Sequence, residues 1–106
     1  MTTMSKLDLN EMREAAGQAS ALMKVFGHRG RLMILCYLAD GEKSVGELSD
    51  LLQMPQSSLS QHLARMRAER LVETRRESQT VFYYLNSGDV RRVIECLYDI
   101  YCPAKG

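Results

Sequence analysis

Three cysteines are the most reactive side chains of this chain of 106 residues: Cys36, Cys96 and Cys102. A thiolate can attack an electrophile, bind a metal ion or form a disulfide. No two of them form a Cys-x-x-Cys pair, so they do not match a structural zinc site. An odd number also argues against a fixed disulfide framework. Two interpretations stay open: buried thiols that pack as small hydrophobic groups, and thiols that react.

A second set of chemically useful side chains lies between residues 56 and 67 and is rich in Ser, Gln and Arg. Leu59, Leu63 and Met66 recur there at helical spacing and should pack inward. The polar side chains then face outward, where hydroxyl and amide groups can bond to base edges and phosphates. The residues predicted to contact DNA are Gln56, Ser57, Ser58, Ser60, Gln61, His62 and Arg65, together with Arg75 and Arg76 further along the chain.

Local charge is compatible with DNA binding, although the net charge of the chain is only +1. Residues 56–79 contain five arginines and three glutamates, which is a local excess of +2. Arginine suits bidentate contacts with phosphate or guanine. Charge alone would equally fit a solvated helix with salt bridges, so the order of the surrounding elements decides between the two interpretations.

That order comes from hydrophobic spacing and turn residues. Helices are predicted over 9–26, 29–39, 44–52, 56–69 and 87–102, and strands over 71–76 and 80–85. Gly27 should end the first helix, and Asp40 with Gly41 the second. Ser44 and Glu47 have the spacing of a capping box, which would begin the third helix. A turn at 53–55, which ends in a proline, separates the third helix from the fourth, and residues 77–79 would form a hairpin loop.

The elements predict a mainly α fold: a winged helix-turn-helix with five helices and a two-stranded β-hairpin wing. We expect a single domain over 1–106, with residues 1–8 flexible, the helix-turn-helix at 44–69, the wing at 71–85 and a C-terminal dimerisation helix at 87–102. Both terminal helices carry an apolar stripe that so small a core cannot cover. A two-fold homodimer through these helices is therefore expected; packing of both helices on their own subunit is the alternative.

Composition limits the location of the protein. No apolar run approaches the roughly 20 residues that a membrane span needs. The first ten residues also lack the basic-then-apolar pattern of a secretion signal. We therefore expect a cytoplasmic protein without membrane contact, and no residue pattern calls for a cofactor.

Five segments resemble the ArsR/SmtB family of winged-helix repressors, over about residues 15 to 103. They are Phe-Gly-His-Arg-Gly-Arg-Leu-Met-Ile-Leu-Cys (26–36), Ser-Val-Gly-Glu-Leu-Ser (44–49), Ser-Leu-Ser-Gln-His-Leu (58–63), Leu-Val-Glu-Thr-Arg-Arg (71–76) and Thr-Val-Phe-Tyr-Tyr-Leu (80–85). The resemblance implies a dimer, with the first and last helices at its interface, that binds a palindromic operator in double-stranded DNA.

The metal sites of that family are not matched here. Many members bind a metal through a Cys-Val-Cys-like motif on the third helix, where this chain has Ser44, Val45 and Gly46. Others use Asp and His on the last helix, which here contains no histidine. The two histidines are His28, interpreted as a polar residue at a helix start, and His62 on the fourth helix. No metal site is therefore expected.

The chain is similar to a branch of the family that lacks metal ligands and keeps two cysteines: the persulfide-responsive BigR/SqrR/YgaV-like repressors, with HlyU also similar. Cys36 and Cys102 match the two cysteines in their local sequence. The resemblance implies that reactive sulfur species join these thiols through a disulfide or a polysulfide and lower the affinity for DNA.

The chemistry of these thiols can also be considered without the resemblance. Cys36 lies in an apolar helix, which should raise its pKa, and Cys102 lies near a chain end, where it should be the more accessible thiol. A disulfide needs Cα atoms within about 7 Å, and each added sulfur extends the reach by about 2 Å. A pair slightly too far apart for a disulfide could thus select persulfide over peroxide. Cys96 lies on another face of the last helix and is interpreted as an accessory or buried thiol.

Other functions remain as alternatives. The same fold could sense general oxidants through a simple disulfide, or could act like HlyU by displacing another repressor. A thiol-disulfide or peroxide-reducing enzyme would need a Cys-x-x-Cys or Cys-His pair, which the chain lacks, so no enzymatic activity is expected. A pure dimerisation module would not need the Ser-, Gln- and Arg-rich segment.

Overall fold

The computed structural model describes residues 7–102. They form two compact units, which divide after Leu32. In the first unit, helix α1 spans Leu9–Phe26, as predicted. Asp8 caps it: its carboxylate accepts from the backbone N–H of Glu11 at 2.7 Å, and the Glu11 carboxylate accepts from the backbone N–H of Asp8 at 3.1 Å. Of residues 1–8, predicted to be flexible, residues 1–6 lie outside the described part of the chain, and Asp8 is held in this capping box.

Helix α2 spans Arg29–Ala39, and its second half belongs to the second unit. Ile34, Leu35 and Leu38 are buried there because they recur on one face of the helix. The helix ends where the sequence predicts. Its last carbonyls accept from the N–H groups of Asp40 and Gly41 at 3.1 Å, and Gly41 has a φ of +145°, which favours glycine.

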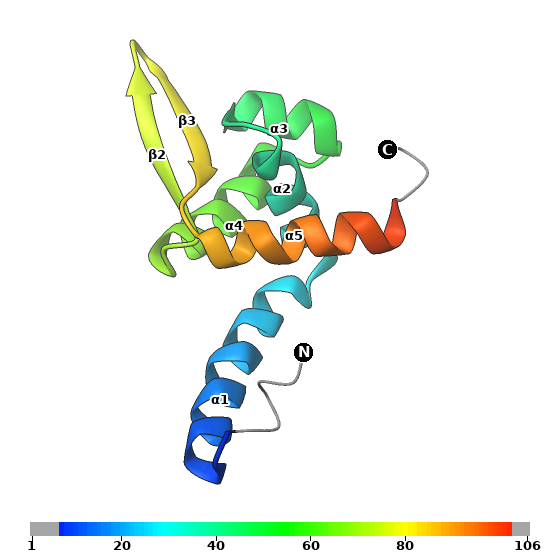
Figure 1. Cartoon of the computed structure of the whole chain (residues 1–106). Helices are drawn as coiled ribbons and strands as arrows, with labels where there is room; N and C mark the ends of the chain where they lie inside the picture. Colours follow the sequence, from blue (N-terminus) through cyan, green and yellow to red (C-terminus); the bar gives the residue numbers. More distant parts are fainter. Residues whose placement is uncertain (1–6, 103–106) are drawn as a thin grey trace. The chain divides into compact units, whose positions relative to one another are not determined.

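The helix-turn-helix consists of α3, Val45–Leu52, and α4, Gln56–Ala68. The predicted capping box begins α3: Ser44 Oγ accepts from the N–H of Glu47 at 3.1 Å, and Glu47 Oε1 accepts from the N–H of Ser44 at 2.8 Å. Gln53 ends α3 in the left-handed conformation, and Pro55 is the N-cap of α4. Figure 1 shows α3 and α4 as separate helices joined by a short turn.

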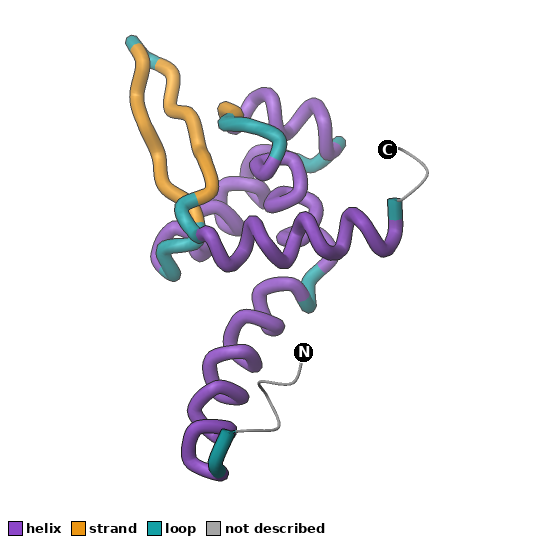
Figure 2. The backbone as a smooth tube through the Cα atoms, viewed as in Figure 1, coloured by secondary structure: helices purple, strands orange, loops and turns teal. Residues whose placement is uncertain are grey.

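The wing is one sheet of three antiparallel strands in the order β1-β3-β2. β2, Val72–Glu77, and β3, Thr80–Leu85, form the predicted hairpin, with Val72 paired to Leu85 and Glu77 to Thr80. β1, Lys43–Ser44, adds a strand that the sequence does not indicate, because two residues are too few to show a period of two. Figures 1 and 2 show the long hairpin projecting from the helices of the second unit, with a short loop at its tip.

Helix α5, Gly88–Tyr101, closes the second unit. Ser87 caps it, with its hydroxyl accepting from the N–H of Val90 at 3.1 Å. Val90 and Ile94 are buried, whereas the last turns expose large apolar side chains: Tyr98, Ile100 and Tyr101 are 52%, 57% and 77% exposed. Within residues 7–102, no helix is long and apolar enough to cross a membrane. The predicted winged helix-turn-helix with five helices is confirmed, and its hairpin is extended by β1.

Candidate functional site

Helix α4 presents two chemically different faces. Leu59, Leu63 and Met66 are fully buried in the second unit. The predicted DNA-contacting residues Gln56, Ser57, Ser58, Ser60, Gln61 and Arg65 are all exposed, and His62 is half-buried. The structure thus gathers these side chains on one helix, with a rigid apolar face behind them.

The N-terminus of α4 adds backbone donors to this surface. The N-cap is Pro55, and no side chain caps the helix. The first N–H groups of a helix have no partner within it and carry a partial positive charge. They lie beside the exposed Gln56, Ser57 and Ser58. Such a terminus suits an anion, in particular a phosphate.

Ion pairs offset part of the excess positive charge of residues 56–79. Arg65 lies 3.7 Å from Glu69, and Arg67 lies 3.6 Å from Glu73, both at the surface. Such exposed ion pairs contribute little to the free energy of folding, so each arginine can leave its glutamate to bind another anion. Arg70 and Arg76 make no ion pair with any residue of the described part of the chain.

Arg75 on β2 is held more firmly than the other arginines. Its Nε donates to both carboxylate oxygens of Glu42, at 2.8 and 3.0 Å, and its Nη1 donates to Glu77 at 3.1 Å. Its guanidinium carbon lies 4.9 Å from the centre of the Phe82 ring. The hydrogen bond from Arg75 holds the pKa of Glu42 below its usual range. The sequence does not indicate a role for Glu42, because it is 33 positions from Arg75 and no local pattern includes it.

Cys36 and Cys102 lie within electrostatic range of each other. Cys36 lies on α2, and Cys102 is the C-cap of α5, with its N–H donating to the carbonyl of Tyr98 at 2.7 Å. Partial desolvation of the thiol by the protein around it raises the pKa of Cys36, as predicted, although the residue as a whole is exposed, and a charge on Cys102 raises this pKa further. An electrostatic effect of this kind acts over several ångströms, so it places the two thiols in the same region of the second unit without requiring contact. Cys96 is exposed on α5, so its interpretation as a buried thiol is wrong.

One expectation about these thiols is wrong. Cys102 is the thiol expected to be more accessible, yet Cys36 is exposed whereas Cys102 is half-buried. The reason for the exposure of Cys36 is tertiary: it lies on the part of α2 that borders a cavity, although its neighbours in the sequence are apolar. Position near a chain end does not by itself give exposure.

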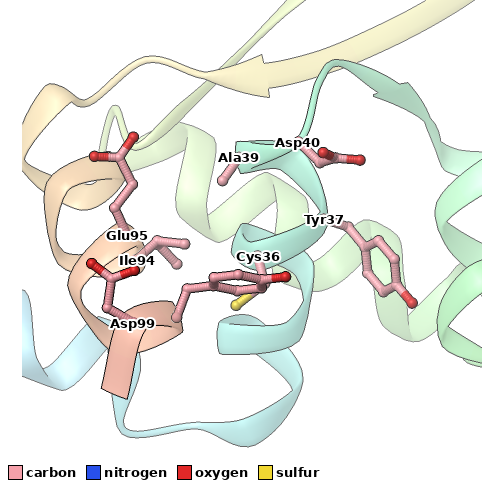
Figure 3. Close-up of a pocket in the computed structure, with 8 residues that line it drawn as sticks. Cys36, Tyr37, Ala39, Asp40, Ile94, Glu95 and Asp99 are labelled. Atoms are coloured by element: carbon pink, nitrogen blue, oxygen red, sulfur yellow. The ribbon is translucent and has the colours of Figure 1, made fainter. Parts of the chain in front are cut away.

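The cavity beside Cys36 has a volume of about 500 Å³. It lies between the second half of α2 and the middle of α5, and Figure 3 shows the sulfur of Cys36 directed toward α5. Its lining is partly apolar, with acidic groups at the edge: Cys36, Tyr37, Ala39, Asp40, Ile94, Glu95, Tyr98 and Asp99. A small molecule can therefore approach this thiol from the side of α5.

Metal ligation is a separate question. No group of three or more His, Cys, Asp or Glu side chains within residues 7–102 is arranged to hold a metal ion. His28 uses its Nδ1 to accept from the N–H of Gly30 at 3.1 Å, which makes it a cap of the first turn of α2. This is the structural role that the sequence suggests for it.

The architecture has close counterparts among known proteins. Residues 28–74 match the family model described as "Bacterial regulatory protein, arsR family". The chain is 50% identical over 98 residues to the transcriptional activator HlyU of Vibrio cholerae, covering 92% of this chain and 91% of that protein. It is 42% identical over 97 residues to the biofilm growth-associated repressor of Agrobacterium fabrum, covering 92% and 83%.

A solved structure agrees with these sequence matches. The structure described as reduced HlyU from Vibrio cholerae superposes with a TM-score of 0.83 at 51% identity, covering 89% of this chain and 99% of that chain. Identity at this level over nearly the whole length, together with the helix-turn-helix and wing, fixes the family. This chain belongs to the arsR family of bacterial transcriptional regulators.

Proposed function

We propose that this chain is a cytoplasmic, homodimeric repressor that binds palindromic operator DNA and senses reactive sulfur species through Cys36 and Cys102. The observation that carries the sensing part is the exposed thiol of Cys36 beside a cavity lined by α5, the helix that ends at Cys102. A charge on Cys102 raises the pKa of Cys36, which supports the pairing of these two thiols. The DNA-binding part is supported by the exposed polar face of α4 and by family membership.

The proposed DNA contacts divide between α4 and the wing. The exposed residues of α4, Gln56, Ser57, Ser58, Ser60, Gln61 and Arg65, with the half-buried His62, would enter the major groove. Its N-terminal N–H groups would bind a phosphate. On the wing, Arg75 and Arg76 are the proposed DNA contacts, and of these two Arg76 makes no ion pair with any residue of the described part of the chain.

Dimerisation through the terminal helices is supported by their exposed apolar groups. Leu9 and Met23 of α1 are 64% and 53% exposed, and Ile100 and Tyr101 of α5 are 57% and 77% exposed. Contiguous exposed apolar surface marks an interface, and a dimer that pairs these helices would cover such side chains. A two-fold dimer would present two α4 helices to half-sites spaced about 34–36 Å apart.

The proposed reaction begins with a persulfide, R–S–SH. The thiolate of Cys36 attacks the terminal sulfur, the S–S bond breaks, RS⁻ leaves, and Cys36 becomes Cys36–S–SH. The thiolate of Cys102 then attacks the sulfur attached to Cys36, which forms a disulfide and releases HS⁻. If Cys102 has itself become a persulfide, its terminal sulfur attacks instead, and a trisulfide forms with release of HS⁻.

The link would act on DNA binding through α5. A covalent bond between α2 and the end of α5 changes how α5 packs, and α5 carries part of the proposed dimer contact. The spacing of the two α4 helices then no longer matches the half-sites. A loss of about 3 kcal/mol would lower the affinity for DNA more than a hundredfold.

Two alternatives share this fold. In the first, this chain would activate transcription by displacing another repressor. The relative HlyU, at 50% identity, is named a transcriptional activator, which supports this alternative. A general oxidant sensor that forms a simple disulfide is the other. A solved HlyU structure described as reduced is compatible with redox chemistry in either case.

The test measures DNA affinity and intact mass after treatment with persulfide or with hydrogen peroxide. Persulfide should weaken binding in the wild type and in the control Cys96→Ser. Cys36→Ser and Cys102→Ser should bind DNA and not respond. The mass should show loss of two protons, with or without added sulfur, only when both cysteines are present. Release from Cys36→Ser, or a link that maps to Cys96, would refute the sensor pair. An equal response to peroxide would favour the general oxidant sensor.

A further inference from the structure

The guanidinium group of Arg75 is bound on several sides. Glu42 accepts from its Nε and Nη2, Glu77 accepts from its Nη1, and the ring of Phe82 lies against its face at 4.9 Å. A bidentate pair between arginine and a carboxylate fixes direction as well as distance. Arg75 is therefore held in one orientation by groups of its own chain.

The contacts of Arg75 join the two outer strands of the sheet. Arg75 lies on β2, and its cross-strand partner Phe82 lies on the central strand β3. Phe82 pairs on its other side with Ser44 of β1, and Glu42 immediately precedes β1. The Arg75 side chain thus crosses the central strand, over Phe82, and reaches the segment that leads from α2 into β1. The free hairpin is tied to the body of the second unit at this point.

The charges around Arg75 oppose a role in phosphate binding. Two carboxylates, Glu42 and Glu77, surround one guanidinium, so the cluster carries a net charge of −1. A phosphate approaching this face would be repelled. The next residue, Arg76, points to the opposite face of β2, because successive side chains of a strand alternate. Arg76 is exposed and makes no ion pair with any residue between 7 and 102.

We propose that Arg75 is a positioning residue that, with Glu42, fixes the direction of the wing, while Arg76 makes the wing's phosphate contact. This rests on the proposed function, since the wing must approach DNA for its direction to matter. It separates two adjacent arginines that the sequence treats alike. The role of Glu42 is to hold Arg75, and through it β2.

The two possible roles of Arg75 give opposite signs for Glu42→Gln. If Arg75 contacts phosphate and Glu42 merely competes for it, removal of the carboxylate releases Arg75 and strengthens DNA binding. If the pair positions the wing, Glu42→Gln weakens operator binding, by about threefold to tenfold for a dimer with two wings. Glu77→Gln is the matched control: it removes the same charge beside Arg75 and leaves the bidentate pair. It should leave affinity unchanged or raise it.

The salt dependence of binding gives a second test that separates position from charge. Arg76→Gln should make the slope of log K against log salt shallower by about 0.9 for each lost phosphate contact, or about 1.8 for the dimer. Arg75→Gln should lower affinity with little change in slope. Arg75→Lys keeps the charge and loses the fork-shaped bidentate contact, so it should bind as weakly as Arg75→Gln. Thermal unfolding of each variant shows whether the second unit stays folded.

The outcomes distinguish this inference from the proposed function. Stronger DNA binding by Glu42→Gln, or full affinity in Arg75→Lys with a shallower slope in Arg75→Gln, would overturn the positioning role. An unchanged slope in Arg76→Gln would remove the wing from the DNA interface, and with it this part of the proposed function. Weak binding by Glu42→Gln and Arg75→Lys, with normal binding by Glu77→Gln, is the result that supports the pair.

Discussion

The thiol of Cys36, on α2, lies close enough to the thiol of Cys102, at the end of α5, for a charge on Cys102 to raise the pKa of Cys36. The effect of burial on Cys36 is larger than the effect of Cys102, and both disfavour the thiolate. Cys36 is nevertheless exposed beside a cavity of about 500 Å³. The pair therefore combines an accessible thiol with a low thiolate fraction at neutral pH, which limits reaction with weak oxidants.

The pH dependence of Cys36 alkylation should show this coupling. In Cys96→Ser, the alkylation rate at Cys36 should rise with pH and level off above about pH 8.5, which is the pKa typical of a free thiol. The reason is that desolvation and the charge on Cys102 both raise the pKa of Cys36. In Cys96→Ser/Cys102→Ser, the plot of rate against pH should shift to lower pH. It should stay above the pKa of a free thiol, since the desolvation of Cys36 remains. Site-resolved mass spectrometry with iodoacetamide measures the rates. Identical curves in the two variants would show that the thiols do not interact.

The face of α4 should determine affinity for the operator. Gln61→Ala, or Arg65→Ala, should weaken the free energy of operator binding by about 1–3 kcal/mol if the side chain contacts a base. The exposed ion pair between Arg65 and Glu69, at 3.7 Å, should not prevent Arg65 from contacting DNA, because such pairs add little to the free energy of folding. Fluorescence anisotropy with operator DNA measures the affinity. Arg29→Ala, exposed on the first turn of α2, is the control for a lost positive charge. Wild-type affinity in both α4 variants would exclude this helix as the reading element.

The stability of the helix-turn-helix should depend on its cap and on its apolar face. Ser44→Ala removes the capping box of α3 and should lower the free energy of unfolding by about 1 kcal/mol. Leu63→Ala removes a fully buried side chain and should cost about 2–5 kcal/mol. Ser57→Ala, at an exposed site, should change stability by less than about 0.5 kcal/mol. Urea unfolding followed by circular dichroism gives all three values, and an equal cost for Ser44→Ala and Ser57→Ala would contradict the capping role.

Zinc should not act as a specific effector. Within the described residues, no cluster of three potential ligands is present. Stoichiometric zinc should therefore leave operator affinity unchanged, and calorimetric titration should detect no tight site. Cadmium is a poorer probe, because it reacts with thiols without a preformed site. Zinc-dependent release that persists in Cys36→Ser/Cys102→Ser would reveal a metal site built from other residues.

Local patterns determined most of the fold. The spacing of Leu59, Leu63 and Met66 fixes the buried face of α4, and all three are fully buried. Ser44 and Glu47 specify the start of α3, because both hydrogen bonds of a capping box join residues three apart. The bounds of α1 and α2 match those predicted from the sequence, because helix starts and ends also depend on residues a few positions apart. Helix and hairpin signals are short-range, so a single sequence contains them.

Tertiary structure alone decided the relationships on which function depends. The pairing of β1 with β3, the hold of Glu42 on Arg75, and the proximity of Cys36 to Cys102 all join residues distant in the chain. No residue pattern encodes them, because they result from how α2, the wing and α5 pack around a shared core. The sequence supplied two reactive thiols and two adjacent wing arginines. Packing left Cys36 more exposed than Cys102 and paired Arg75 with carboxylates, since burial and charge pairing depend on neighbours that only the folded chain brings together.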